Sequence, residues 1–313
     1  MNQFLSIDDV ADPIALISKA LKIKSNPLED PEVGKNKTLG LFFFNPSLRT
    51  RLSSQRAASN LGLNVMTMNV MNEGWQLEFG DRVIMDGAKA EHIREAAKVI
   101  SQYCDIIGIR SFAEMKNYDE DKSEKIINGF SAHATKPVIS LESCTLHPLQ
   151  SLADVMTIEE NKKSGKPKVV LTWTPHPRAL PPAVSNSFSQ WMNKFEAEFI
   201  ITHPKGLDLD PDFVGAAKII HNQEQAFENA DFIYAKNWSA GLSYGKPIKD
   251  HQDWKITEKK MALTNNGKFM HCLPVRRNVL VEDAVLDSEN SLVIEQADNR
   301  TYAAQTVLKE LLT

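Results

Sequence analysis

The residues best suited to chemistry follow short apolar runs of the chain, at the points where those runs end. In an open parallel sheet, ligands bind outside the carboxyl ends of the strands, so polar residues at these points are candidates for one site. They are Asn45-Pro46-Ser47-Leu48-Arg49-Thr50-Arg51, Arg110, Glu142, His147-Pro148-Leu149-Gln150, His176, Lys236-Asn237-Trp238 and His271-Cys272-Leu273-Pro274-Val275-Arg276-Arg277. Cations, an amide and imidazoles are therefore predicted to converge on one rim.

The segment after the first run is the most explicit anion site. Ser47 is a natural N-cap for a helix, and the first turn of a helix offers N–H groups and the positive end of its dipole. Arg49 and Thr50 would stand beside that point, which makes a phosphate cradle without a Gly-rich loop. An ordinary capped helix with solvated arginines has the same pattern. Arg110 favours the anion site, because a guanidinium at the end of an apolar strand needs a partner and no acidic residue adjoins it.

Several other candidates also have purely structural interpretations. His147 and His176 suit buried hydrogen-bonding roles as well as catalysis. Cys272 could be a nucleophile, although a small residue at a strand end is more often inert packing. His271 and Cys272 would point to opposite faces of a strand, so we do not expect them to share a metal. Trp75 lies in a polar loop, where it either packs on its own domain or marks a contact surface.

The elements that must position these residues alternate between strands and helices. Strands are predicted at 39–44, 64–70, 105–110, 137–142, 168–174, 198–203, 231–237 and 268–273. Helices are predicted at 47–61, 92–104, 149–163, 186–194, 223–229 and 297–312, where apolar residues recur three or four apart. This alternation predicts an α/β fold with mostly parallel sheets flanked by helices.

Length and proline content add to this organisation. A chain of 313 residues is typical of two domains or one large one. The charged segment 159–168 is the boundary that composition favours. The segment 174–187 holds four of the 15 prolines, which predicts a stiff, irregular loop.

Composition excludes several classes of protein. Charged residues make up 24% and hydrophobic residues 42%, which is ordinary for a globular chain. With 36 Lys and Arg against 40 Asp and Glu, the net charge of -4 gives no global field for nucleic acid or a membrane surface. No apolar stretch approaches the roughly 18 residues of a membrane span, and the first ten residues lack a signal-peptide pattern, so we expect a cytoplasmic protein. Three cysteines without a C-x-x-C motif predict reduced thiols and no structural metal.

Three segments together resemble one enzyme family. The segment Phe44-Asn45-Pro46-Ser47-Leu48-Arg49-Thr50-Arg51 resembles the carbamoyl-phosphate signature of the aspartate/ornithine carbamoyltransferases. His147-Pro148-Leu149-Gln150 is similar to their H-P-x-Q motif, and His271-Cys272-Leu273-Pro274 to the H-C-L-P motif of the ornithine branch. The three occur in family order over nearly the whole chain.

The resemblance is closest to the branch that acts on N-acylated ornithine. Ornithine enzymes carry a D-x-x-x-S-M-G segment whose Asp meets the free α-amino group, and no such segment occurs here. The loop 174–187 and the segment 234–238 instead resemble the acylornithine branch, whose substrate has an amide in place of the α-ammonium. An acid facing that amide would be left unmatched.

The segment 85–92 bears on which acyl group the substrate carries. In the family that the sequence resembles, acetyl-type enzymes have Glu at the position of Ala90, and succinyl-type enzymes have Pro. A succinyl group brings an extra carboxylate that a facing Glu would repel, whereas Ala90 leaves room and charge balance for it. The sequence therefore favours succinyl, with acetyl as the alternative.

The resemblance also implies an architecture. Residues 1–148 would bind carbamoyl phosphate, residues 149–296 would bind the acylornithine, and the helix 297–313 would pack back on the first domain. The acylornithine branch is further similar in having a knotted chain, in which the Pro-rich loop encircles a later segment. Trp75 would arrive from a neighbouring subunit of a homotrimer with shared active sites.

The same resemblance implies roles for individual residues. Those expected at the carbamoyl phosphate are Ser47, Leu48, Arg49, Thr50, Trp75, Arg110, His147, Gln150, Cys272, Leu273 and Arg300. Within this set, Arg110, His147, Thr50 and Arg300 would be catalytic, because they would polarise the carbonyl or add positive charge. Residues expected at the acylornithine are Glu142, His176, Lys236, Arg276 and Ala90. No cofactor, metal or covalent enzyme intermediate is implied.

Three rival functions remain to be separated. A plain ornithine carbamoyltransferase is disfavoured by the absent D-x-x-x-S-M-G segment. A catalytically silent phosphate-binding protein would not need Arg49, Arg110, His147, Gln150 and Arg300 together. A nicotinamide-dependent oxidoreductase would need a G-x-G-x-x-G motif after an early strand, and the sequence contains none.

Overall fold

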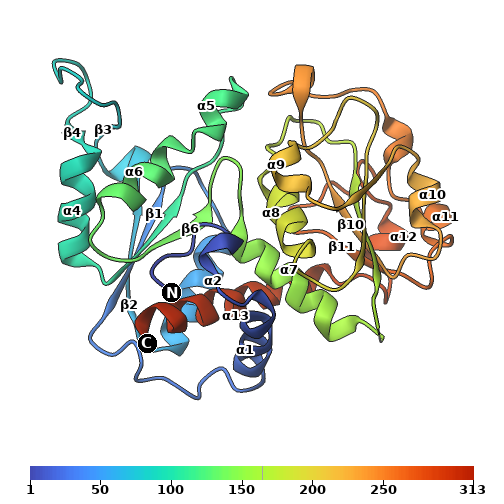
Figure 1. The fold of residues 1–313 in the computed structure, drawn as a ribbon, viewed down its shortest axis with the longest axis horizontal. Coiled ribbons are helices and arrows are strands. Elements are labelled where there is room, and N and C mark those ends of the chain that lie inside the picture. The colour runs from blue at the N-terminus through green and yellow to red at the C-terminus, as the bar shows by residue number, and fades with distance from the viewer. Residues whose placement is uncertain (164) are drawn as a thin grey trace. The chain divides into compact units, whose positions relative to one another are not determined.

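The structure is a computed structural model that describes residues 1–163 and 165–313, and it divides into two compact units (Figure 1). Unit 1 comprises Met1–Glu114, Asp119–Leu149 and Arg300–Thr313, and unit 2 comprises Met115–Tyr118 and Gln150–Asn299. The division at Leu149 lies one residue from the 148/149 boundary that the family resemblance implied. The described residues of 159–168, the boundary that composition favoured, belong to unit 2. The chain passes between units inside helix α7 (Pro148–Asn161), where no change in composition marks the division.

Unit 1 is built on a four-stranded parallel sheet with the order β2-β1-β5-β6. These strands are β1 (Thr38–Phe43), β2 (Asn64–Asn69), β5 (Ile106–Arg110) and β6 (Val138–Glu142). Helices α4 (Ile93–Tyr103) and α6 (Lys125–His133) pack together over one core of this sheet, around Phe42, Ile107 and Phe130. Helices α1 (Pro13–Ser25) and α2 (Arg49–Asn60) and the end of α13 (Val293–Leu312) complete the unit. The Asn60 side chain of α2 donates a hydrogen bond to the Gln305 side chain of α13 at 2.8 Å.

Short elements connect the main elements of unit 1. They are η1 (Ile7–Asp9), α3 (Val70–Glu73), α5 (Tyr118–Lys122) and the paired two-residue strands β3 (Leu77–Glu78) and β4 (Glu91–His92). Strand β2 lies at an edge of the sheet and is only half buried, whereas every residue of β5 and β6 is buried. One face of β2 is therefore left open.

Unit 2 is built on a five-stranded parallel sheet with the order β11-β10-β7-β8-β9. The strands are β7 (Lys168–Trp173), β8 (Glu198–Thr202), β9 (Lys218–Ile220), β10 (Phe232–Lys236) and β11 (Lys268–Met270). On one face, Phe188 of α8 (Ala183–Met192) packs edge-on against Tyr234 and Phe199. On the other, Val170 and Ile233 meet a core that includes residues of α10 (Gln223–Phe227) and α12 (Asp283–Leu286).

The remaining elements of unit 2 are short. They are α9 (Pro211–Val214), α11 (Glu258–Met261), η2 (Gly241–Ser243) and η3 (Gln252–Trp254). Among the described residues, none of the helices has the length and hydropathy of a membrane span.

The predicted strands are confirmed, and seven of the eight agree with the structure to within one residue at each end. The last one is too long: β11 ends at Met270, because the His271 side chain accepts a hydrogen bond from the Leu273 amide at 2.9 Å and turns the chain out of the sheet. His271 and Cys272 therefore lie beyond the strand, and the argument that they face opposite sides of it does not hold.

Two further local predictions are corrected by the structure. Ser47 is not the N-cap of α2: the cap position is Leu48, whose backbone is helical and whose side chain accepts no hydrogen bond. The Pro-rich loop ends earlier than expected, because helix α8 already begins at Ala183, directly after Pro182. The knotted path stays a prediction.

Candidate active site

Unit 1 places its charged residues where the strand order reverses. From β1 the chain continues to β2 on one side of β1, and β5 lies on the other side, so the β1/β5 boundary is the topological switch point. Ligands of open α/β sheets bind in the crevice at such a point. Arg110 ends β5 and pairs in register with Glu142, which ends the neighbouring β6. The fold thus gathers at this edge the residues that the sequence analysis had found apart.

Arg110 and Glu142 form a buried ion pair, each being 8% exposed. The Arg110 Nη2 atom lies 2.8 Å from the Glu142 Oε2 atom, and the His147 Nε2 atom lies 3.8 Å from the same oxygen. Sequence reasoning assigned Glu142 to the acylornithine. The structure puts its carboxylate against Arg110 and His147, two residues expected at the carbamoyl phosphate, and its place at the acylornithine stays a prediction. A buried guanidinium requires such a partner, and sheet register supplied the one that the sequence did not reveal.

Arg110 also braces the turn that follows β1. Its Nη1 atom donates to the backbone carbonyls of Asn45 and Pro46, at 3.2 and 3.0 Å. The Asn45 side chain accepts from the Phe112 amide at 2.6 Å, so both strand ends are fixed to each other. The Arg110 Nε atom is buried, and within residues 1–163 and 165–313 it has no hydrogen-bond partner. One donor of this guanidinium is thus available to a ligand.

The first turn of α2 is tied to the last helix of the chain. Thr50 is buried and its hydroxyl accepts from the Arg300 Nη2 atom at 2.6 Å, although the two residues are 250 positions apart. Ser47 and Arg49 are half buried beside this contact, and Leu48 is exposed. Because no side chain caps this helix, its positive end is not neutralised from within α2. The arrangement can bind an anion.

Sequence reasoning missed the residue that holds the loop before His147. Glu124 adopts a left-handed backbone conformation with φ of 51°, and its carboxylate accepts from the Thr145 amide at 2.6 Å and the Cys144 amide at 3.1 Å. It also accepts from the hydroxyls of Ser143 and Thr145, at 2.6 and 2.5 Å. A single carboxylate thereby fixes the segment between Glu142 and His147. The residue type of a glutamate does not reveal a positive φ, so no sequence pattern indicates the role of Glu124.

Unit 2 also places its polar residues at a strand-order reversal, between β7 and β10. The Asn237 side chain after β10 donates to the Thr174 carbonyl after β7 at 2.6 Å, which joins the two strand ends. His176 follows in the same loop, and its Nδ1 atom contacts the Arg178 backbone.

His176 lies in a positive field. Burial lowers the pKa of its imidazole, and the nearby cations of Lys236, Arg276 and Arg178 lower it further, so this histidine is neutral at pH 7. Lys236 is half buried at the end of β10 and Arg276 is exposed. Three of the five residues predicted at the acylornithine, His176, Lys236 and Arg276, are therefore brought together. A pocket of about 310 Å³ opens beside His176, with Pro247 and Val279 in its lining.

Gln150 and the segment after β11 belong to one buried network in unit 2. The Gln150 Nε2 atom and the Gln296 Nε2 atom each donate to the Asp154 Oδ1 atom at 2.7 Å. The Gln296 Oε1 atom in turn accepts from the His271 amide at 2.9 Å. Leu273, two residues on, has a positive φ of 55°, a strained conformation for a branched side chain. The backbone expected at the carbamoyl group is thus held in an unusual shape.

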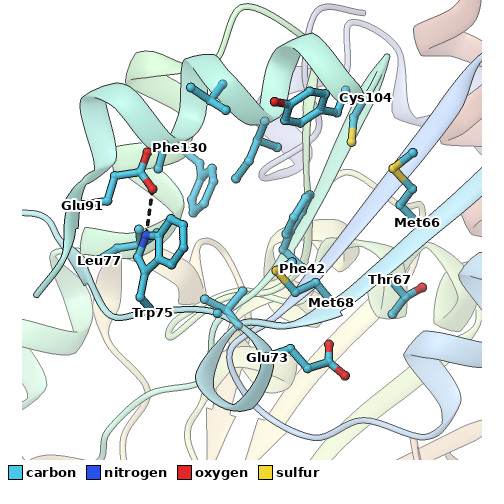
Figure 2. A pocket seen from close by; sticks show the side chains of 16 residues that line it. Phe42, Met66, Thr67, Met68, Glu73, Trp75, Leu77, Glu91, Cys104 and Phe130 are labelled. Carbon is cyan, nitrogen blue, oxygen red and sulfur yellow. Dashed lines mark hydrogen bonds between the residues drawn. The ribbon is translucent and has the colours of Figure 1, made fainter.

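Trp75 lies on the surface of unit 1, with 61% of its side chain exposed. It borders an apolar pocket of about 480 Å³, and its indole Nε1 atom donates to the Glu91 carboxylate at 2.8 Å (Figure 2). Ala90, next to Glu91, is exposed and its amide donates to the Gln76 carbonyl at 3.1 Å. The indole plane is therefore held at the surface instead of in a core.

The neighbourhood of Ala90 is charged but internally paired. Lys89 lies 3.0 Å from the Glu78 carboxylate. The Gly80 amide and then the Lys89 side chain hold the pKa of Glu78 down, at about 2.

Cys104 and Cys144 do not have the environment of reactive thiols. Burial raises the pKa of the Cys104 and Cys144 thiols, and nearby Glu124 raises that of Cys144 further. Within the described part of the chain, no three His, Cys, Asp or Glu residues gather as metal ligands. The chemistry that the site can perform rests on cations, amides and imidazoles.

This arrangement defines a class of protein, and comparison with known proteins gives the same one. Residues 2–160 match the carbamoyl-P binding domain of aspartate/ornithine carbamoyltransferase, and residues 182–311 match its Asp/Orn binding domain. The chain belongs to the aspartate/ornithine carbamoyltransferase family.

Its relatives include both acylornithine types. The chain is 52% identical to the N-succinylornithine carbamoyltransferase of Bacteroides fragilis, over 100% of this chain and 99% of that one. It is 35% identical to the N-acetylornithine carbamoyltransferase of Xanthomonas campestris, over 100% and 98%. A solved N-acetyl-L-ornithine transcarbamylase variant, with a glutamate replaced by alanine and with carbamyl phosphate and N-succinyl-L-norvaline bound, aligns at a TM-score of 0.92 and 34% identity over 99% and 100%.

The cations of unit 1 give a first prediction. We expect Arg49→Ala or Arg110→Ala to weaken carbamoyl phosphate binding about 10- to 100-fold, the effect of losing one charge-assisted contact. Arg49→Ala should keep the thermal stability, whereas Arg110→Ala should lower it, because Glu142 is left buried without its partner. Isothermal titration measures the affinity, and thermal unfolding checks the fold. Arg56→Ala, an exposed cation further along α2, is the matched control. An affinity equal to that of the control in either variant would contradict the assignment.

Proposed function

We propose that this chain transfers the carbamoyl group of carbamoyl phosphate to the δ-amine of N-succinyl-L-ornithine, giving N-succinyl-L-citrulline and phosphate in arginine biosynthesis. The observation that carries the proposal is the full-length 52% identity to an N-succinylornithine carbamoyltransferase. It is supported by the cations that the fold places at two strand-order reversals. N-acetyl-L-ornithine is the alternative acceptor, because the chain is also similar to N-acetylornithine carbamoyltransferases.

Unit 1 would hold the phosphate. Ser47, Leu48 through its backbone, Arg49 and Thr50 surround the uncapped end of α2, and Arg300 reaches the same point through its hydrogen bond to Thr50. The doubly charged phosphate then meets guanidinium groups and the helix dipole together.

Reaction requires that the carbamoyl carbonyl be polarised and its NH2 group be held. Arg110, His147 and Thr50 would donate toward the carbonyl oxygen, where negative charge develops as the tetrahedral intermediate forms. The NH2 group is a donor, and it would be held by acceptors: the Gln150 side chain and the Cys272 and Leu273 backbone carbonyls. The intermediate then expels phosphate, so no covalent enzyme intermediate is needed.

Unit 2 would hold the acceptor. Lys236 and Arg276 would pair with its carboxylates, and neutral His176 would contact it as a hydrogen-bonding group. The δ-amine must lose a proton before it attacks, and the departing phosphate can take that proton. Glu142, which pairs with Arg110, would also contact the acceptor.

The direct test is product formation with four acceptors at equal concentration: ornithine, N-acetylornithine, N-succinylornithine and aspartate. We expect a carbamoylated product from N-succinylornithine at a rate at least about 10-fold above the others, since a missing charge contact costs at least that much. Turnover with N-acetylornithine alone would select the alternative. Turnover with free ornithine, or with none of the four, would contradict an acylornithine carbamoyltransferase.

Ala90 would set the preference for the acyl group. In solved relatives of the acetyl type, a glutamate replaced by alanine, proline, serine or valine accompanies bound N-succinyl-L-norvaline. We propose that Ala90 stands at the place of that glutamate. A glutamate there would repel the distal carboxylate of a succinyl group.

Ala90→Glu should therefore shift the preference toward N-acetylornithine. We expect the ratio of kcat/KM for the succinyl substrate to that for the acetyl substrate to fall about 10-fold or more, mainly through loss of the succinyl reaction. Ala90→Gln is the matched control, since it adds nearly the same volume without charge. If both variants change the ratio equally, size and not charge decides, and the electrostatic explanation is wrong.

We also propose a cytoplasmic homotrimer with shared active sites. Exposed large apolar side chains gather in unit 1 between residues 48 and 85, including Leu52, Met66, Met68, Met71 and Trp75. Such patches mark interaction surfaces. Met66 and Met68 lie on the half-open edge strand β2 and line the apolar pocket together with Trp75. A neighbouring copy would cover this surface, and Trp75 would then reach the neighbour's carbamoyl phosphate.

Mixing two inactive variants tests the sharing. Trp75→Ala and Arg110→Ala should each lower activity strongly while keeping the oligomer, and mixing them after subunit exchange should restore up to about one quarter of the sites by random assortment. Light scattering gives the size of the oligomer, and an activity assay gives the recovery. Absence of recovery after exchange has been verified would contradict shared sites, and a monomer would contradict the assembly itself.

A further inference from the structure

Asp154 is a fully buried acid that the proposed mechanism does not use. It lies on α7 one turn after Gln150, and its side chain is 0% exposed. Its Oδ1 atom accepts from the amide nitrogens of both Gln150 and Gln296 at 2.7 Å. Burying a carboxylate costs free energy unless hydrogen bonds replace its contacts with water, so an acid in the core is expected to have a specific role.

An ionised carboxylate only accepts hydrogen bonds, and this gives a direction to each amide that contacts it. The Gln150 side chain must turn its NH2 group toward Asp154, which directs its Oε1 atom away from Asp154. The same holds for Gln296, whose Oε1 atom accordingly accepts from the His271 amide at 2.9 Å. Asp154 therefore determines which end of two glutamines is the donor and which the acceptor.

The contacts of Asp154 fit its role as an acceptor, because two amide N–H groups donate to one of its oxygens. Burial, and then the charge of Asp154 beside it, raise the pKa of the Tyr234 phenol, so this neighbour stays protonated and neutral. Cys272 is another titratable group that faces Tyr234, and Tyr234 and Cys272 are both buried.

We propose that Asp154 is a positioning residue for the carbamoyl group, because it makes Gln150 present an acceptor oxygen instead of a donor nitrogen to the carbamoyl NH2. The inference rests on the proposed function. Through Gln296 and the His271 amide, the same carboxylate also fixes the start of the segment whose Cys272 and Leu273 carbonyls complete the acceptor set. If residue 154 were an asparagine, the Gln150 side-chain amide could rotate by half a turn. The NH2 group of Gln150 would then face the NH2 group of the carbamoyl moiety, and no hydrogen bond could form between them.

Acetyl phosphate separates this role from a general structural one. It has the shape of carbamoyl phosphate, but a methyl group replaces the NH2 group, so it gains nothing from an oriented acceptor. The selectivity for carbamoyl phosphate over acetyl phosphate, as a ratio of dissociation constants, therefore measures the orientation of Gln150. Loss of folding or of the phosphate site would weaken both ligands together and leave the ratio unchanged.

The experiment is a donor–acceptor exchange at the Gln150–Asp154 contact. We expect Asp154→Asn to lower the selectivity about 10-fold, the effect of losing one hydrogen bond to a buried polar group. In the double variant Gln150→Glu/Asp154→Asn the roles are exchanged: the asparagine NH2 group donates to the glutamate carboxylate. The other oxygen of that carboxylate is again offered to the carbamoyl NH2 group. It should recover most of the selectivity, and an equal or lower selectivity than in Asp154→Asn would overturn the proposal.

A second comparison keeps the test decisive if Asp154→Asn alone does not fold. Gln150→Glu alone places two carboxylates against each other, and adding Asp154→Asn to it should then raise the selectivity about 10-fold. No increase would equally overturn the proposal. The acceptor assay on the wild-type chain separates the two levels: an inactive wild type contradicts the proposed function, whereas an active wild type with unchanged selectivity in the variants contradicts only the role of Asp154.

Discussion

A buried charge is tolerated only where partners are fixed around it, and the site of this protein depends on that constraint. Arg110 is buried at the end of β5, so it needs the Glu142 carboxylate and two backbone carbonyls to be stable. Those partners come from the neighbouring strand and from the turn after β1. Stabilising one guanidinium therefore also determines the shape of the turn that leads into α2. The position of this cation and the shape of the turn beside it are thus both consequences of the cost of burying a charge.

The sequence predicts the scaffold well because parallel strands have a simple signature. Strands buried on both faces need continuous apolar, β-branched runs, and the polar residue that ends each run marks the functional edge. The segments 105–110 and 137–142 show this, since they end at Arg110 and Glu142 and match β5 and β6 to within one residue. The family motifs then identify the chemistry, because Ser-x-Arg-Thr, His-Pro-x-Gln and His-Cys-Leu-Pro occur at such edges.

What the sequence cannot predict is which residues meet across elements. The pairing of Arg110 with Glu142 depends on sheet register, and the Thr50–Arg300 contact joins positions 250 apart. Glu124 acts through a left-handed backbone that its residue type does not announce. The misassigned cap at Ser47 has a similar cause: the serine pattern fits a cap, but the helix begins one residue later, after Leu48. These local choices are decided by tertiary contacts, which patterns of single residues do not contain.

The cations of unit 2 have an effect beyond binding carboxylates. The field that lowers the pKa of His176, from Lys236, Arg276 and Arg178, acts on any basic group that enters it. An ammonium brought close to these side chains is disfavoured relative to the neutral amine, and only the neutral amine is a nucleophile. An acceptor with two carboxylates offsets more of this positive charge than an acceptor with one, so it binds more favourably. Carboxylates that pair with these cations would also cancel part of the field that lowers the pKa of His176, so the binding of an anion and the protonation of His176 are coupled.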